Sequence, residues 1–206
     1  SWPLQRVINE VHQLEGGGTL AVLLGIHALN HGYHARLYSY NLTVFDPTWE
    51  GLPPTDLRRK LIAQTRIKDG KKLHIASLAY SRFLKDGGQI LFDDPTPDLL
   101  RHYFHRRLPV LAGLSATYLY RSKREYADSR GRSVYDDLRG KPMGHFVVLS
   151  GMENKHVFVA DPFHDNPMAE GRTYQVPVGR LINSIMLGIV TYDANLLVLS
   201  PDPFKE

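Results

Sequence analysis

Two residues in the second half of the chain, His145 and Asp161, are the strongest candidates for acid–base chemistry in this sequence. They belong to the predicted strands His145–Ser150 and His156–Asp161, which have hairpin spacing with a loop slightly longer than the tightest turn. Pairing about a centre near Glu153 places the two side chains roughly opposite one another, as cross-strand neighbours. A carboxylate bonded to one ring nitrogen would fix the imidazole tautomer and leave the other nitrogen facing a reacting group.

A second set of candidate residues precedes the most apolar segment of the chain. Gln13 is followed, after five residues, by Thr19, which opens the predicted buried helix Thr19–Asn30. A side-chain amide and the unpaired N–H groups of a first helical turn can bind an oxyanion, and a threonine hydroxyl can act as a nucleophile. The alternative is structural: Thr19 caps the helix and the glycines before it make a tight turn. Three glycines would also let a substrate backbone pass close: Gly16, Gly17 and Gly18.

These residues and their order resemble the papain-like superfamily, and specifically the bacteriocin-processing, double-glycine peptidase branch with its bacterial relatives. The sharpest matches are Gln13, the strand Gly144-His145-Phe146-Val147-Val148 and the step Asp161-Pro162. In that family a glutamine donates to the oxyanion, a cysteine at a helix N-terminus attacks, a histidine is the base and an aspartate orients it. The resemblance therefore implies these roles for Gln13, His145 and Asp161, a papain-like fold and a peptide-like substrate.

The chain departs from the family at the nucleophile, because it contains no cysteine. Counting from Gln13 in the family's spacing puts Thr19 in the cysteine's place, whereas aligning on the family's Asp-Cys-Gly step, with Glu15 as the acid, puts Gly16 there. In the first alignment Thr19 attacks and His145 removes its proton during the attack, since a hydroxyl does not pre-form a thiolate–imidazolium pair. In the second alignment the chain is an inactive relative that binds a peptide or leader segment.

The elements that must position these residues predict an α+β fold, with helices first and an antiparallel sheet later. We expect one papain-like domain over residues 1–206, in which a buried N-terminal helix and a helical half pack on a C-terminal sheet. A long polar loop, Arg121–Met143, is a candidate substrate-covering element. The other predicted helices are Thr55–Ile67, Leu73–Lys85, Thr96–Arg107 and Val178–Leu187, and the other predicted strands are Ala35–Leu42, Val110–Tyr120 and Leu196–Leu199.

Composition narrows the functional classes further. Hydrophobic residues make up 43% and charged residues 22% of the 206, which excludes a disordered or fibrous chain. No apolar run approaches the roughly 20 residues that cross a bilayer, so we expect no membrane insertion and a cytoplasmic protein. The net charge of +4 is small and dispersed without a binding motif, so we expect no nucleic-acid partner.

Three histidines, His27, His31 and His34, have the spacing of a helix-borne metal pair with a third ligand nearby. Histidine near a helix C-terminus is also favoured by the helix dipole alone. Since no glutamate accompanies the pair as a metalloprotease would need, we expect no metal and no cofactor.

Overall fold

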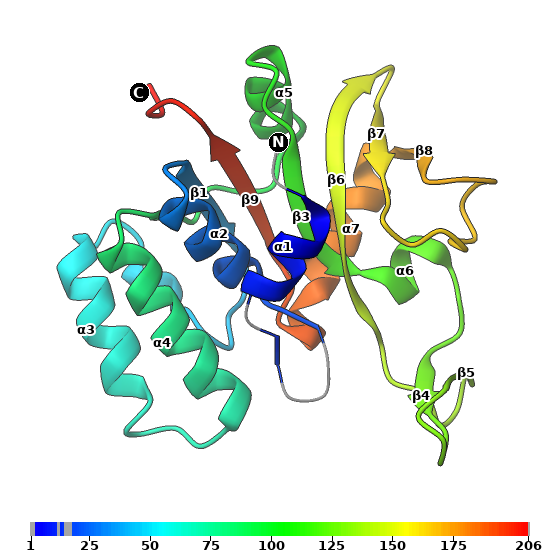
Figure 1. Cartoon of the computed structure of the whole chain (residues 1–206), viewed down its shortest axis with the longest axis horizontal. Helices are drawn as coiled ribbons and strands as arrows, with labels where there is room; N and C mark the ends of the chain where they lie inside the picture. The colour runs from blue at the N-terminus through cyan, green and yellow to red at the C-terminus, as the bar shows by residue number, and fades with distance from the viewer. Residues whose placement is uncertain (1–2, 12, 15–17, 206) are drawn as a thin grey trace. The chain divides into compact units, whose positions relative to one another are not determined.

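A computed structural model of the chain describes residues 3–11, 13–14 and 18–205 (Figure 1). The chain forms two compact units, Ser1–Phe92 with Leu197–Glu206, and Asp93–Leu196. Both units combine helices with strands, so the predicted α+β class is confirmed. The extent of a single papain-like domain over residues 1–206 stays a prediction.

Besides the end of the final strand, the first unit contains four α-helices, one 3-10 turn and two short parallel strands among its described residues. Strands β1 and β2 pair with Leu37 level with Ile90. Helix α2 contacts β1 and α4, and α3 contacts α4. The elements are α1 (Leu4–Glu10), α2 (Ala21–Asn30), β1 (His34–Ser39), η1 (Pro47–Trp49), α3 (Pro54–Gln64), α4 (Lys71–Lys85) and β2 (Gln89–Leu91).

Helix α2 is buried, as its nearly all-round apolar sequence predicts. A Cβ placed on Gly25 would lie 2.7 Å from the Phe83 ring of α4, so glycine at this position permits the close approach of the two helices. The predicted helix start at Thr19 was wrong, because α2 begins at Ala21 and Leu20 is its N-cap, without a side-chain cap bond. Thr19 therefore lies before the cap, and the capping interpretation of Thr19 was wrong as well.

In the second unit, strands β3, β6, β7 and β8 lie side by side in this order, each antiparallel to its neighbour. Helix α7 contacts β3, β7 and β8, and α5 contacts β6. The final strand, β9 (Asn195–Ser200), contains the boundary between the units. The elements before it are α5 (Pro97–His105), β3 (Val110–Ser115), α6 (Ala116–Tyr120), β4 (Glu125–Ala127), β5 (Ser133–Tyr135), β6 (Gly144–Glu153), β7 (His156–Ala160), β8 (Thr173–Pro177), α7 (Val178–Leu187) and η2 (Gly188–Thr191).

The predicted strand Val110–Tyr120 was wrong in its second half. The strand ends at Ser115, whose hydroxyl accepts a hydrogen bond from the Tyr118 amide at 3.3 Å and caps the short helix α6. The Arg180 guanidinium donates to the main-chain oxygens of Leu119 (3.0 Å) and Tyr118, so it satisfies carbonyls at the end of this helix. Local capping thus overrides the strand preference of the aromatic residues.

The hairpin that carries His145 is tighter than the sequence predicts. Strands β6 and β7 are joined by two residues, Asn154 and Lys155, with φ of 47° and 65°. Positive φ at both central residues is the backbone of a type I′ turn, which matches the twist of the flanking strands. The hairpin loop is therefore a two-residue loop, shorter than the sequence predicts, and strand β6 extends to Glu153.

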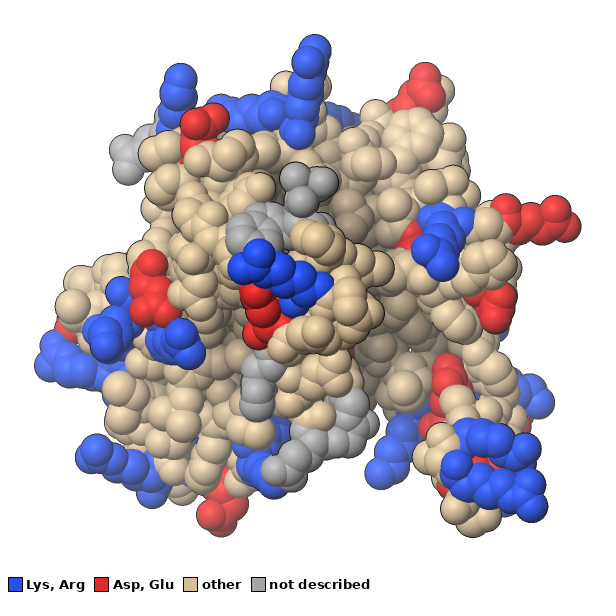
Figure 2. All heavy atoms as spheres, in the orientation of Figure 1, with Lys and Arg blue, Asp and Glu red and all other residues tan. Residues whose placement is uncertain are grey.

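The segment Arg121–Met143 is not a long structureless loop, because it contains the antiparallel pair β4 and β5. Figure 2 shows Lys and Arg side chains gathered over this pair with acidic groups among them. Two of the arginines form ion pairs with nearby aspartates, Arg132 with Asp128 at 2.8 Å and Arg139 with Asp136 at 2.7 Å. Across the chain, none of the helices in the described part is both long and apolar enough to span a membrane.

Candidate functional site

The two leading candidates from the sequence meet in the second unit. His145, on β6, places Nε2 at 2.7 Å from Oδ1 of Asp161, which follows directly after β7. The His145 side chain is 21% exposed to solvent, whereas the Asp161 side chain is fully buried at 0%. Because Nε2 is engaged by the carboxylate, Nδ1 is the ring nitrogen left for a reacting group.

Asp161 is held by more than the histidine. Its Oδ2 accepts hydrogen bonds from the hydroxyls of Tyr120 (2.7 Å) and Tyr174 (2.6 Å), and its Oδ1 also accepts from the Phe163 amide at 2.9 Å. An ionised carboxylate offers about four lone-pair sites, so these three donors and the imidazole satisfy it. A buried charge is tolerable when it is paired and fully hydrogen-bonded, which is the state of this carboxylate.

These contacts set the ionisation of the site. Burial by itself would raise the pKa of Asp161, but the hydrogen bonds from Tyr174, His145, Tyr120 and the Phe163 amide outweigh it and lower that pKa. Burial, followed by the bond to the Asp161 carboxylate, raises the pKa values of the Tyr120 and Tyr174 hydroxyls. Asp161 is thus an anion and both tyrosines are neutral donors near neutral pH.

The two catalytic candidates meet along a diagonal rather than directly opposite one another. Val148 pairs with Ala160, and continuing this register places Asp161 level with Val147, two residues from His145. The sequence prediction missed the register because the turn has two residues and the pairing shifts between Leu149 and Gly151. Diagonal neighbours on one face are still within reach of long side chains, and the imidazole bridges the offset.

Sequence reasoning missed both tyrosines that hold Asp161. Tyr120 lies at the end of α6, where the sequence predicted a strand, and Tyr174 lies on β8, which was not predicted. Thr173–Pro177 does alternate between exposed and buried residues, so a period-two pattern could have revealed the strand. Nothing in the spacing of Tyr120 indicates its contact, since it depends on where α6 turns the chain.

The remaining candidates lie in the first unit. Gln13 is exposed and Thr19 is half-buried, while Gly16 and Gly17 lie outside the described residues. The Leu14 amide donates to the Gly18 carbonyl oxygen at 2.9 Å. Gly18 has φ of +77° and a Cβ there would meet nothing within 4 Å, so its backbone conformation rather than packing favours glycine. The pairing of Thr19 with His145 stays a prediction.

The histidine cluster of the first unit differs from the predicted one. His34 is exposed at the start of β1, and the third group beside His27 and His31 is Glu10 of α1. The helical motif itself lacks a glutamate, as expected from the sequence, and the glutamate beside the pair comes from a different helix. Seventeen positions separate Glu10 from His27, so no helical spacing reveals the contact.

Comparisons with known proteins add little to this geometry. No family model and no curated protein matches the sequence. Among solved structures, the chain is similar to the crystal structure of a candidate C39-like peptidase from Bacillus anthracis, with 17% identity and a TM-score of 0.30 over 52% of this chain and 48% of that chain. A likeness this weak assigns no function, which depends on the residues of the site itself.

Proposed function

We propose that this protein is a papain-like amide-bond hydrolase or acyl transferase that acts on a peptide-like substrate, with His145 as its general base. The observation that carries the proposal is the 2.7 Å bond between His145 Nε2 and an Asp161 carboxylate that is itself held by two tyrosine hydroxyls. Such a carboxylate fixes the tautomer of the imidazole and stabilises the imidazolium that forms when the ring takes a proton. The partial exposure of His145 leaves its ring open to a substrate.

In this proposal Thr19 supplies the nucleophile. Nδ1 of His145 takes the hydroxyl proton as the Thr19 oxygen bonds to the substrate carbonyl carbon, and the Gln13 amide donates to the oxyanion. Nδ1 then returns the proton to the leaving nitrogen as the carbon–nitrogen bond breaks. Water, or an amine in the case of acyl transfer, releases the acyl group from Thr19 with His145 again as base. Gly16, Gly17 and Gly18 would lie along the substrate backbone.

The second candidate function is peptide or leader binding without turnover. Two observations favour it: the sequence has no cysteine, and Thr19 precedes the N-cap of α2 instead of opening its first turn. A hydroxyl in that position is not aligned with the N–H groups of a helix start. In this case His145 and Asp161 have a structural role and the peptide binds unchanged.

Amide turnover in matched histidine variants tests the proposal. A library of peptide and arylamide substrates is incubated with the wild type, His145→Ala, Thr19→Ala and the control His156→Ala. His156 lies exposed on the neighbouring strand β7, and its Nδ1 contacts the Asn154 carbonyl oxygen. We expect turnover to fall at least about 100-fold in His145→Ala, the lower end of what general-base catalysis supplies, and to stay unchanged in His156→Ala.

The variants also separate the two candidate functions. Turnover that survives His145→Ala refutes the hydrolase. Turnover that depends on His145 but not on Thr19 leaves the general base in place and refutes Thr19 as the nucleophile. Saturable peptide binding with no turnover in the wild type supports the binding function.

A further inference from the structure

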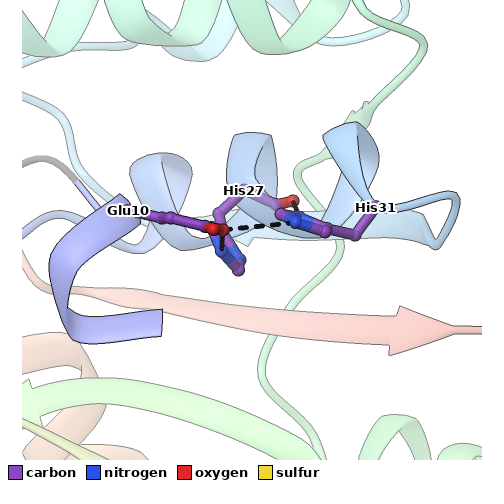
Figure 3. Close-up of side chains that lie close together, drawn as sticks. All are labelled: Glu10, His27 and His31. Atoms are coloured by element: carbon purple, nitrogen blue, oxygen red, sulfur yellow. Dashed lines mark hydrogen bonds and ion pairs between the residues drawn. The ribbon is translucent and has the colours of Figure 1, made fainter. Parts of the chain in front are cut away.

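Three side chains converge in the first unit: Glu10 of α1, His27 of α2 and His31, the residue that follows α2 as its C-cap (Figure 3). Oε2 of Glu10 lies 3.0 Å from Nε2 of His27 and 3.2 Å from Nε2 of His31, and all three atoms lie within 4.8 Å of one another. Ligand atoms bound tetrahedrally at about 2.0–2.1 Å from a zinc ion are about 3.3 Å apart. The two glutamate–histidine separations are therefore close to the separation of ligand atoms around one ion.

The orientation of His31 gives an independent reason to place a positive charge here. Its Nδ1 lies 2.8 Å from the main-chain oxygen of His27. A carbonyl oxygen accepts and cannot donate, so Nδ1 carries the proton and the lone pair of the neutral ring is on Nε2. That lone pair faces the carboxylate oxygen of Glu10, which is repulsive unless a proton or a metal cation lies between the two atoms.

The surroundings of the cluster hold its groups in place. A histidine bonded through one nitrogen to a backbone carbonyl has the outer-shell contact that orients metal-binding imidazoles. Arg6 donates from Nε to the other carboxylate oxygen of Glu10, at 2.7 Å, which leaves Oε2 directed at the histidines. The side chains of His27 and His31 are 16% and 17% exposed and that of Glu10 is 34% exposed, so the two histidines are sheltered while the cluster is accessible to an ion.

We propose that Glu10, His27 and His31 bind a divalent transition-metal cation of the zinc class through Oε2 of the glutamate and Nε2 of each histidine. Two imidazoles and one carboxylate are a ligand set that zinc accepts, with a fourth position left for water. This set suits a hard cation such as Mg²⁺ poorly, because Mg²⁺ prefers oxygen ligands. The site is independent of the proposed hydrolase chemistry at His145.

The cation would fasten α1 to α2. Helix α1 has seven residues and none of them is buried. Isolated helices this short are marginal in water, so α1 depends on contacts such as those of Glu10. An ion that binds the assembled cluster stabilises the docked helix by mass action. We therefore expect bound zinc to slow hydrogen exchange of the α1 amides.

Calorimetric titration of the untagged, chelator-treated chain with ZnCl₂ tests the site, with MgCl₂ as the comparison metal. The variants are Glu10→Gln and His31→Gln, which keep the side-chain size, and the matched control is His34→Ala, just beyond the same helix. We expect one equivalent of Zn²⁺ to bind saturably, no saturable binding of Mg²⁺, and at least about tenfold weaker zinc binding in both ligand variants, because loss of even an outer-shell partner costs that much.

Hydrogen exchange monitored by mass spectrometry supplies a readout that nonspecific binding of zinc to other histidines would not change. Zinc should protect the peptide that covers residues 3–11 in the wild type and in His34→Ala, but not in Glu10→Gln. The absence of saturable zinc binding, or equal affinity in the wild type and both ligand variants, would overturn the proposal and assign the positive charge of the cluster to a proton. Neither result bears on turnover at His145.

Discussion

Replacing Asp161 by alanine should expose how the candidate site is held together. The substitution leaves the hydroxyls of Tyr120 and Tyr174 without their shared acceptor. A buried donor without a partner costs about 1–3 kcal/mol. The two hydroxyls also interact with one another, so one can donate to the other, and the one donor left unpaired predicts a loss of about 1–3 kcal/mol in the free energy of unfolding. Tyr174 is buried and Tyr120 only half-buried, so water offsets part of the cost at Tyr120.

A double-mutant cycle between Asp161→Ala and Tyr174→Phe isolates this effect, with urea unfolding as the assay. In the wild type, Tyr174→Phe removes a hydrogen bond to a charged group and should cost about 1.5–3 kcal/mol. In the Asp161→Ala background the Tyr174 hydroxyl no longer has a charged acceptor to lose, so the same substitution should be close to neutral. An equal cost in both backgrounds would refute the reasoning, because contacting residues that share a bond do not behave additively.

Three further outcomes follow from the same structure. Folding lowers the pKa of Asp161, so its contribution to stability is present above the unfolded-state pKa of about 3.9 and is lost as the pH falls through the lower folded value. The free energy of unfolding should therefore fall less steeply with acid in Asp161→Asn than in the wild type. A Cβ on Gly144 would overlap the Asp193 carboxylate, so Gly144→Ala should cost about 1–3 kcal/mol of stability and lower the melting temperature. The control Gly179→Ala, where a Cβ meets nothing within 4 Å, should not lower it. Equal melting temperatures in the two variants would contradict the packing around Gly144. Lys155 has φ of 65°, so Lys155→Gly should raise the urea midpoint by an amount equivalent to about 0.5–1 kcal/mol, and an unchanged or lower midpoint would count against a type I′ turn.

The fold could be predicted from the sequence wherever a single segment contains its own hydrophobic periodicity or the glycines and prolines that end an element. Helix α7 has the predicted bounds Val178–Leu187, and α4 ends at Lys85 as predicted, ahead of Gly87 and Gly88. The failures came where a local hydrogen bond decided the structure. Ser115 ends a strand and caps α6 within a run of strand formers, and no periodicity signals that change.

The candidate site was predictable only in part, for a physical reason. His145 lies on one strand of a hairpin and Asp161 directly follows the other, so their sequence spacing already implies proximity. Tyr120 is 41 positions from Asp161, and Glu10 is 17 positions from His27, so their contacts depend on how separate elements pack. Chemistry assembled across elements of this kind leaves no local pattern in the sequence.

The protonation pattern of the His145 ring tests the central claim most directly. Long-range ¹H–¹⁵N spectra of the full chain distinguish a nitrogen that carries a proton from one that does not. With the ring neutral, Nε2 should carry the proton toward Asp161 and Nδ1 should be the bare, basic nitrogen that receives a proton from a nucleophile. A proton on Nδ1 of the neutral ring would contradict the proposal that Asp161 prepares His145 as a general base.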